Sequence, residues 1–273
     1  MQEIIDKLSA NVPHSHNEYM GNDGLLRCGV CHRATQTVVY LPFLNPPRKV
    51  VRCICDCRAK ELEQAKLRDE QMERDKLRSV CFNKTNMGGW TFEADDRRDP
   101  RLSDAMLRYA EQFNDFKRDG KGLLLHGAVG TGKTYYAACI ANYLIDRGQR
   151  VLMRNFAELT NQMQANFGAK QAIIDDLNRY PLLILDDLGA ERNTEYMQEM
   201  VFNIIDSRYR SGLPMIVTTN LTADEIKHPK DVASQRIYDR VIERCFPIEV
   251  SGRSRRREAL KNTHADVKNR LGL

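Results

Sequence analysis

An eight-residue glycine-rich segment constrains the fold of this chain more than any other feature. It reads GAVGTGKT from Gly127 to Thr134 and matches the pattern G-x-x-x-x-G-K-[ST]. The short apolar run Gly122–His126 precedes it, and a helical pattern over Tyr135–Arg147 follows and ends at Gly148. A strand, a glycine-rich turn and a helix in this order are the context that a phosphate-binding loop requires. The segment therefore predicts a phosphate-binding loop between a buried strand and a helix.

Each part of this loop has a physical role. Glycines let backbone N–H groups turn inward around phosphates, and the helix N-terminus adds the positive end of its dipole. Lys133 is expected to reach the β- and γ-phosphates of ATP, and the Thr134 hydroxyl to bind Mg²⁺. The predicted nucleotide-binding residues are Gly127, Ala128, Val129, Gly130, Thr131, Gly132, Lys133 and Thr134.

Two later apolar runs end in polar residues that suit ATP hydrolysis. Pro181–Leu185 is followed by Asp186, which we expect to hold Mg²⁺ through water, and by Asp187. Asp187 stands where many such ATPases have a glutamate that polarises the attacking water. Because aspartate is one methylene shorter, we expect slow hydrolysis. The run 214–219 is followed by Asn220, whose amide can position that water, although asparagine at such a place often caps a helix.

Apolar runs of strand length alternate with helical patterns through the last two thirds of the chain. This alternation predicts an α/β fold with a parallel sheet that is covered on both faces. The five expected strands are Gly122–His126, Arg150–Arg154, Pro181–Leu185, 214–219 and Phe246–Val250.

Cysteines mark a second, smaller module. Five of the eight lie between residues 28 and 57, as a C-x2-C pair and a C-x-C-x-C run. In a reducing compartment such clustering indicates a metal site and not disulfides. Four sulfur ligands would hold Zn²⁺ tetrahedrally and leave no open position, so the role is structural. The expected ligands are Cys28, Cys31, Cys53 and Cys55, with Cys57 and His32 as alternatives.

The regions around the cysteines suggest how the chain is divided. Strands over Thr35–Leu41 and Lys49–Arg52 predict a hairpin between the two cysteine arms. Arg58–Arg78 contains no Gly or Pro and only a weak apolar stripe, which predicts a solvated helix. We therefore expect a zinc-binding docking domain over 1–57, a charged helical linker over 58–80 and an ATPase domain over 81–273.

Charge is concentrated at the C-terminus. The net charge of +5 is matched by the segment Ser251–Leu273, which has seven basic and two acidic residues. A basic tail of this kind favours phosphate or nucleic acid as a partner, and a solvated helix is the alternative. No apolar run approaches the roughly 18–20 residues of a membrane helix. The N-terminus lacks a secretory pattern, so we expect a soluble cytoplasmic protein without a membrane partner.

Arginines recur at four-residue spacing in the helical pattern 234–244. Arg236, Arg240 and Arg244 would share one helix face. A cation on that face could reach the γ-phosphate bound by a neighbouring subunit, as an arginine finger does. The alternative is a solvated face with ion pairs to Asp239 or Glu243.

Together these motifs resemble those of the bacterial replicative-helicase loader ATPases of the DnaC and DnaI type, with the IstB transposition helpers as relatives. The resemblance runs from about Cys81 to Arg257 and rests on GAVGTGKT, LLILDDLGAER, IVTTNL, RIYDR, GRSRRR and the lead-in WTFE. It implies an AAA+ (ASCE) P-loop fold. Only 23 residues follow Val250, so the C-terminal lid of most AAA+ proteins has no room. By the same resemblance Arg240 fits the finger position best, Arg236 second, and Arg255 fits the sensor-2 position.

The resemblance also implies a function. It is ATP-dependent loading of a DnaB-type replicative helicase at the initiation of DNA replication. ATP, Mg²⁺ and Zn²⁺ are the expected cofactors. Single-stranded DNA and further copies of the chain are expected partners, and hydrolysis would be stimulated by DNA or by the helicase. An IstB-like transposition helper and a nucleotide-gated DNA-binding scaffold with little turnover are the alternatives. Phages and mobile elements carry similar proteins.

Overall fold

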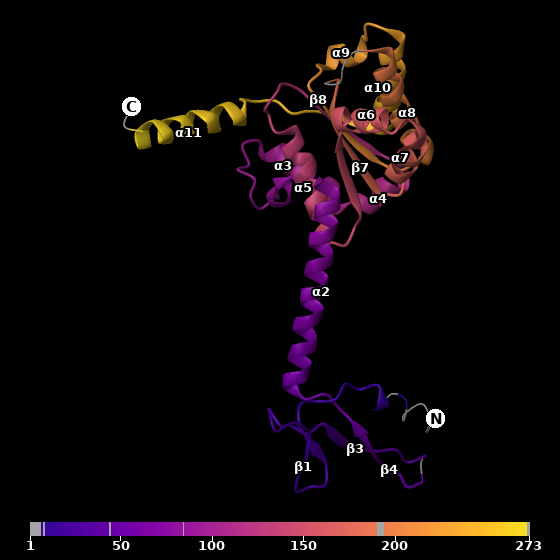
Figure 1. The fold of residues 1–273 in the computed structure, drawn as a ribbon, viewed down its shortest axis with the longest axis vertical. Helices are drawn as coiled ribbons and strands as arrows, with labels where there is room; N and C mark the ends of the chain where they lie inside the picture. Colours follow the sequence, from indigo (N-terminus) through magenta and orange to yellow (C-terminus); the bar gives the residue numbers. More distant parts are fainter. Residues whose placement is uncertain (1–6, 8, 44, 84, 190–193, 272–273) are drawn as a thin grey trace. The chain divides into compact units, whose positions relative to one another are not determined.

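The computed structural model describes residues 7, 9–43, 45–83, 85–189 and 194–271, without the side chains of 167, 259 and 261–266. The chain divides into two compact units, Met1–Glu73 and Arg74–Leu273. The boundary lies inside helix α2 (Asp56–Phe82), which begins two residues before the expected linker and ends four residues after Arg78 (Figure 1).

The first unit contains two small antiparallel sheets. Strands β1 (Tyr19–Met20) and β2 (Leu26–Arg27) form one, and β3 (Gln36–Tyr40) and β4 (Arg48–Arg52) form the other. The second pair is the expected hairpin, with Val38 opposite Val50. Among the described residues of this unit, only four are buried, and none carries an aliphatic or aromatic side chain: Ser15, Cys28, Thr35 and Cys55. Cysteines therefore occupy the place of a hydrophobic core.

The second unit contains the predicted five-stranded parallel sheet. Its strands are β5 (Gly122–His126), β6 (Val151–Asn155), β7 (Leu182–Leu188), β8 (Met215–Thr219) and β9 (Cys245–Glu249), in the order β6-β7-β8-β5-β9. Every residue of β5 and β8 is buried, as expected for a sheet that is covered on both faces. This result confirms the predicted α/β fold.

The strand order determines which strands have neighbouring carboxyl ends. Strand β8 lies between β5, which leads into the glycine-rich loop, and β7, which carries Asp186. The three strands are parallel, so their carboxyl ends lie next to one another. Gly122 allows the close approach of β5 to β8, because a Cβ at this position would collide with the carbonyl oxygen of Met215.

Helices cover both faces of the sheet (Figure 1). On one face the core includes side chains from α3 (Pro100–Glu111) and α5 (Lys133–Asp146), together with the end of α2. On the other it includes α6 (Phe156–Ala165), α7 (Lys170–Leu177), α8 (Glu195–Ser211) and α10 (Val232–Arg244). Shorter elements are η1 (Asn86–Gly89), α4 (Phe113–Asp119), η2 (Phe167–Ala169) and α9 (Ala223–Lys227).

After β9 the described chain forms one helix, α11 (Arg255–Leu271). None of the helices in the described part of the chain is long and apolar enough to cross a membrane.

Candidate nucleotide-binding site and metal centre

The glycine-rich loop has the backbone that its sequence predicts. Gly127, Gly130 and Gly132 have φ angles of 129°, 84° and 115°, which side-chain-bearing residues rarely adopt. The loop ends at Lys133, the first residue of α5. The connection from β9 to α11 passes directly beside it, where the backbone N–H of Arg255 donates to the carbonyl oxygen of Gly130 at 2.9 Å.

Lys133 lies inside this loop. It is 5% exposed, and its Nζ donates to the carbonyl oxygens of Gly127 and Ala128, each at 2.8 Å. Burial lowers the pKa of the Lys133 ammonium, because the charged form loses hydration. Within the described chain this ammonium donates to carbonyl oxygens and to no carboxylate, so its charge is not neutralised by direct contact. The loop therefore fits a bound anion such as a phosphate.

Thr134 and Asp186 come from separate motifs and meet at the end of the sheet. The Thr134 hydroxyl donates to Asp186 Oδ1 at 3.0 Å, and the Thr218 hydroxyl donates to the same atom at 2.6 Å. Asp186 is 7% exposed, and burial raises its pKa. Oxygen ligands of this kind suit Mg²⁺. Thr218 lies within the IVTTNL motif, but the sequence analysis assigned it no role.

Asp187 lies at an irregularity within β7 and has an unusual backbone conformation. Its φ is 61°, and the pairing of β7 with β8 shifts register between Leu185 and Leu188. The Asp187 N–H donates to the Thr218 hydroxyl at 3.0 Å, and Asn155 Nδ2 donates to Asp187 Oδ2 at 3.4 Å. This arrangement separates the two neighbouring carboxylates, with Asp186 buried against the threonines and Asp187 lining a cavity.

That cavity has a volume of about 360 Å³ and brings together residues from the glycine-rich loop, the ends of β7 and β8 and the start of α11. Lys133, Asp187, Asn220 and Arg255 line it, and so does Trp90. The Trp90 ring lies 5.8 Å from the ring of Tyr135, which gives the cavity an aromatic wall in addition to its charged groups. Such a wall suits the base of a nucleotide.

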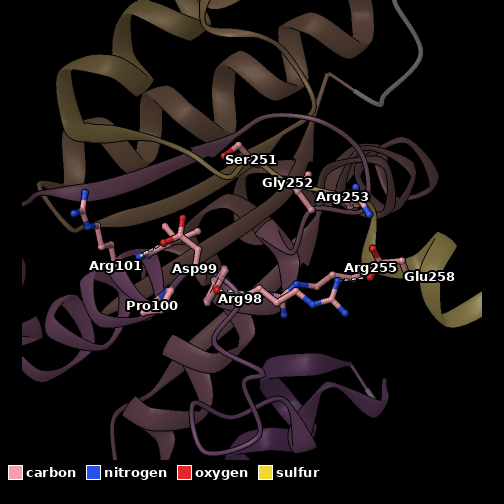
Figure 2. A pocket seen from close by; sticks show the side chains of 12 residues that line it. Arg98, Asp99, Pro100, Arg101, Ser251, Gly252, Arg253, Arg255 and Glu258 are labelled. Atoms are coloured by element: carbon pink, nitrogen blue, oxygen red, sulfur yellow. Dashed lines mark hydrogen bonds and ion pairs between the residues drawn. The ribbon is translucent and has the colours of Figure 1, made fainter.

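Arg255 lies between this cavity and a second one. Its guanidinium pairs with Asp95 at 3.4 Å and with Asp96 at 3.0 Å. The second cavity, of about 650 Å³, lies between the segment before α3 and the β9–α11 connection (Figure 2). Arg98 and Glu258 form an ion pair at its edge. The sequence analysis did not identify the acidic partners of Arg255.

The arginines of α10 lie elsewhere. They are not among the residues that line the nucleotide cavity. Arg240 Nε donates to Asp206 Oδ1 at 2.6 Å, and Arg236 lies over the Phe202 ring. The suggested partners on the same helix were therefore wrong for Arg240, whose carboxylate partner belongs to α8.

The cysteine cluster corrects one predicted ligand. The Sγ atoms of Cys28, Cys31, Cys55 and Cys57 all lie within 4.8 Å of one another. Cys53 is outside this group, because its N–H continues the hairpin by donating to Thr35 O at 2.9 Å and its Sγ points to the Ala34 carbonyl oxygen at 3.5 Å. Cys57 takes its place in the first turn of α2. His32 is also outside the cluster, with its Nδ1 3.1 Å from the Tyr19 hydroxyl.

The four sulfurs fit a zinc ion. Cys57 Sγ lies 3.5 Å from Cys28 Sγ and 3.3 Å from Cys55 Sγ, near the roughly 3.8 Å edge of a tetrahedron with Zn–S bonds of about 2.3 Å. Backbone N–H groups of Cys31 and Val30 point to Cys28 Sγ and lower its pKa to about 6. They thereby favour the thiolate, which is the form that binds metal.

The sheet order, the glycine-rich loop after β5 and the buried carboxylate of β7 define an α/β protein with a phosphate-binding loop. More narrowly, the chain belongs to the family of IstB-like ATP binding proteins, whose model matches residues 62–263.

Named relatives of the chain are helicase loaders. It is 27% identical over 272 residues to the replicative helicase loader DnaI of Bacillus subtilis (strain 168), covering 93% of this chain and 85% of that protein. To the replicative helicase loader DnaC of Escherichia coli (strain K12) it is 26% identical over 141 residues, which cover 50% of this chain and 56% of DnaC.

Solved structures agree with these sequence relatives. A crystal structure of DnaI is 30% identical and has a TM-score of 0.52, covering 62% of this chain and 92% of that one. A crystal structure of the DnaC helicase loader, 23% identical with a TM-score of 0.51, covers 61% of this chain and all of that one. At this level of identity, the DnaC structure supports the fold alone.

Proposed function

We propose that this chain is an ATP-dependent loader of a replicative helicase. The observation that carries the proposal is the extent of the similarity to DnaI. A match over 93% of the chain leaves about 19 residues outside it. The match to DnaI must therefore include most of the first unit, which has 73 residues. A protein that shared only the ATPase unit would not match in this way.

The residues of the second unit have the following roles in this proposal. The Lys133 ammonium neutralises phosphate charge, and the Thr134 hydroxyl and Asp186 carboxylate hold Mg²⁺, which supplies further charge stabilisation. Asp187, oriented by Asn155, accepts a hydrogen bond from the attacking water, and Asn220 helps to position that water. The short Asp187 side chain makes hydrolysis slow, so ATP acts as a timing signal.

Assembly couples this site to the partners. Arg255 contacts the nucleotide of its own subunit, and Arg240 contacts the nucleotide of a neighbour, so ATP favours the oligomer. Exposed arginines of the β9–α11 connection, such as Arg253, bind the phosphates of single-stranded DNA, and affinity therefore falls with salt. The first unit, stabilised by zinc, binds the helicase in the cytoplasm.

The test is a pair of baits in a lysate of the source cells. Asp187→Asn is designed to bind ATP without hydrolysing it, and asparagine tolerates the left-handed backbone of this position. Lys133→Ala is the matched control that cannot bind ATP. Enrichment of the replicative helicase on the first bait supports the proposal. Enrichment of a transposase would instead assign the IstB-like role. Single-stranded DNA without either protein would indicate a nucleotide-gated DNA-binding scaffold.

A further inference from the structure

The surface between α8 and α10 holds a set of contacts that the nucleotide cavity does not use. The two helices pack against each other (Figure 1). The Arg240 guanidinium lies 4.7 Å from the centre of the Phe202 ring and 5.8 Å from that of Tyr209, both on α8. Arg236 lies over Phe202 at 4.3 Å. Aromatic contacts of this kind hold a guanidinium in place.

Asp206 binds the edge of the same Arg240 guanidinium. It follows Phe202 by one turn of α8, and its side chain is 11% exposed. Its Oδ1 accepts a hydrogen bond from Arg240 Nε at 2.6 Å, and its Oδ2 lies 2.7 Å from Arg210 Nη2. The Arg210 side chain is 75% exposed and that of Arg240 is 28% exposed. Solvent therefore weakens the pair of Asp206 with Arg210 far more than its pair with Arg240. Arg240 is the main partner of this buried carboxylate.

This geometry determines which part of Arg240 stays available. Nε is bonded to Asp206, and Nη1 donates to the Arg236 carbonyl oxygen at 3.3 Å. Among the described residues, none accepts a hydrogen bond from Nη2. Because the guanidinium is planar, fixing Nε and the ring contact also fixes the direction of the Nη2 edge.

We propose that Asp206 is a positioning residue for Arg240 and presents this edge to the phosphate oxygens of ATP in a neighbouring subunit. The inference rests on the proposed function, in which Arg240 acts in the site of its neighbour. An arginine that is already oriented loses less side-chain freedom when it binds. Nothing in this role requires Asp206 to touch the nucleotide.

The expected effects differ in size. Loss of an arginine finger typically reduces the rate by about 10³-fold or more, which we expect for Arg240→Ala. Asp206→Ala leaves Arg240 present but no longer holds its guanidinium in a fixed orientation. We therefore expect the DNA-stimulated kcat to fall by about 10- to 100-fold. Asp206→Asn keeps an oxygen that can accept a hydrogen bond from Arg240 Nε and removes the charge. Its kcat should therefore fall less than that of Asp206→Ala. The nucleotide affinity of the isolated subunit should stay unchanged in both Asp206 variants, because Asp206 lies outside the subunit's own nucleotide cavity.

Subunit mixing separates this role from a general effect on folding. Lys133→Ala subunits have an empty site but an intact Arg240, and Arg240→Ala subunits have an intact site. A mixture of the two should regain hydrolysis on single-stranded DNA. Adding Asp206→Ala to the Lys133→Ala subunits should abolish most of this gain, whereas adding it to the Arg240→Ala subunits should change nothing. Asp115→Ala, which removes an exposed pair with Arg118, is the matched control and should be silent in either subunit.

The outcomes are distinguishable. If Asp206→Ala reduces hydrolysis equally in both positions, the residue supports the fold and the inference is overturned. If it has no effect in either position while Arg240→Ala is inactive, only the role of Asp206 is overturned. If Arg240→Ala alone hydrolyses ATP normally, the trans-acting arginine of the proposed function fails, and the inference fails with it.

Discussion

Replacing Cys57 by serine should abolish zinc binding by the first unit and unfold this unit. The buried side chains of the described part of this unit are those of Ser15, Thr35 and two members of the sulfur cluster, so no aliphatic core can substitute for the ion. Structural zinc sites bind with an apparent free energy of about 10–16 kcal/mol. That range reaches or exceeds the roughly 5–15 kcal/mol by which whole domains are stable. Loss of one of four thiolates should therefore leave the module largely unfolded.

Cys53→Ser is the matched control for this experiment. Its sulfur lies outside the cluster and contacts the Ala34 carbonyl oxygen, to which a serine hydroxyl can also donate. Zinc content per chain should be about one for the wild type and for Cys53→Ser, and near zero for Cys57→Ser after dialysis against a chelator. Limited proteolysis should cut only Cys57→Ser within residues 9–43. The reverse result, with zinc lost from Cys53→Ser and kept by Cys57→Ser, would refute the reasoning.

Three further outcomes are expected in the second unit. Asp186→Asn should raise the free energy of unfolding of the nucleotide-free protein by about 0.5–2 kcal/mol in urea titrations. Burial raises the pKa of Asp186, so the charge of its carboxylate opposes folding at neutral pH. A lower free energy of unfolding in the variant would contradict this reasoning. Gly122→Ala should cost about 3 kcal/mol or more, whereas Gly89→Ala, which meets open space, should stay within about 0.5 kcal/mol. Trp90, the single tryptophan, should change fluorescence when ATP is added, and this change should be lost in Lys133→Ala; an unresponsive wild type would remove Trp90 from the nucleotide site.

Local patterns were sufficient to predict most of the second unit. Apolar runs gave the positions of the five strands to within a few residues, because buried parallel strands are almost continuously apolar. The glycine-rich loop was recognisable because its φ angles and its close contacts demand glycine. The order of the strands depends on how distant segments pair, and this order is what brings Asn220 between the loop and Asp186.

The residues that sequence analysis missed act through contacts between elements. Asp206 and Arg240 are 34 positions apart, and neighbouring acids on α10 looked equally suitable as partners. Asp95 and Asp96 reach Arg255 from the segment before α3. The choice between Cys53 and Cys57 depended on where β4 ends and α2 begins. A helix start at Asp56 places Cys57 in the first turn beside Cys55, whereas the expected linker began two residues later.

The most direct test of the loader account uses purified components and closed circular single-stranded DNA. A replicative helicase ring cannot thread onto a circle without opening, so helicase retained on circles after gel filtration measures loading. The account predicts retention that requires both this chain and ATP, and that is lost with Lys133→Ala. Equal retention without the chain, or with Lys133→Ala in its place, would contradict the claim that this protein loads the helicase.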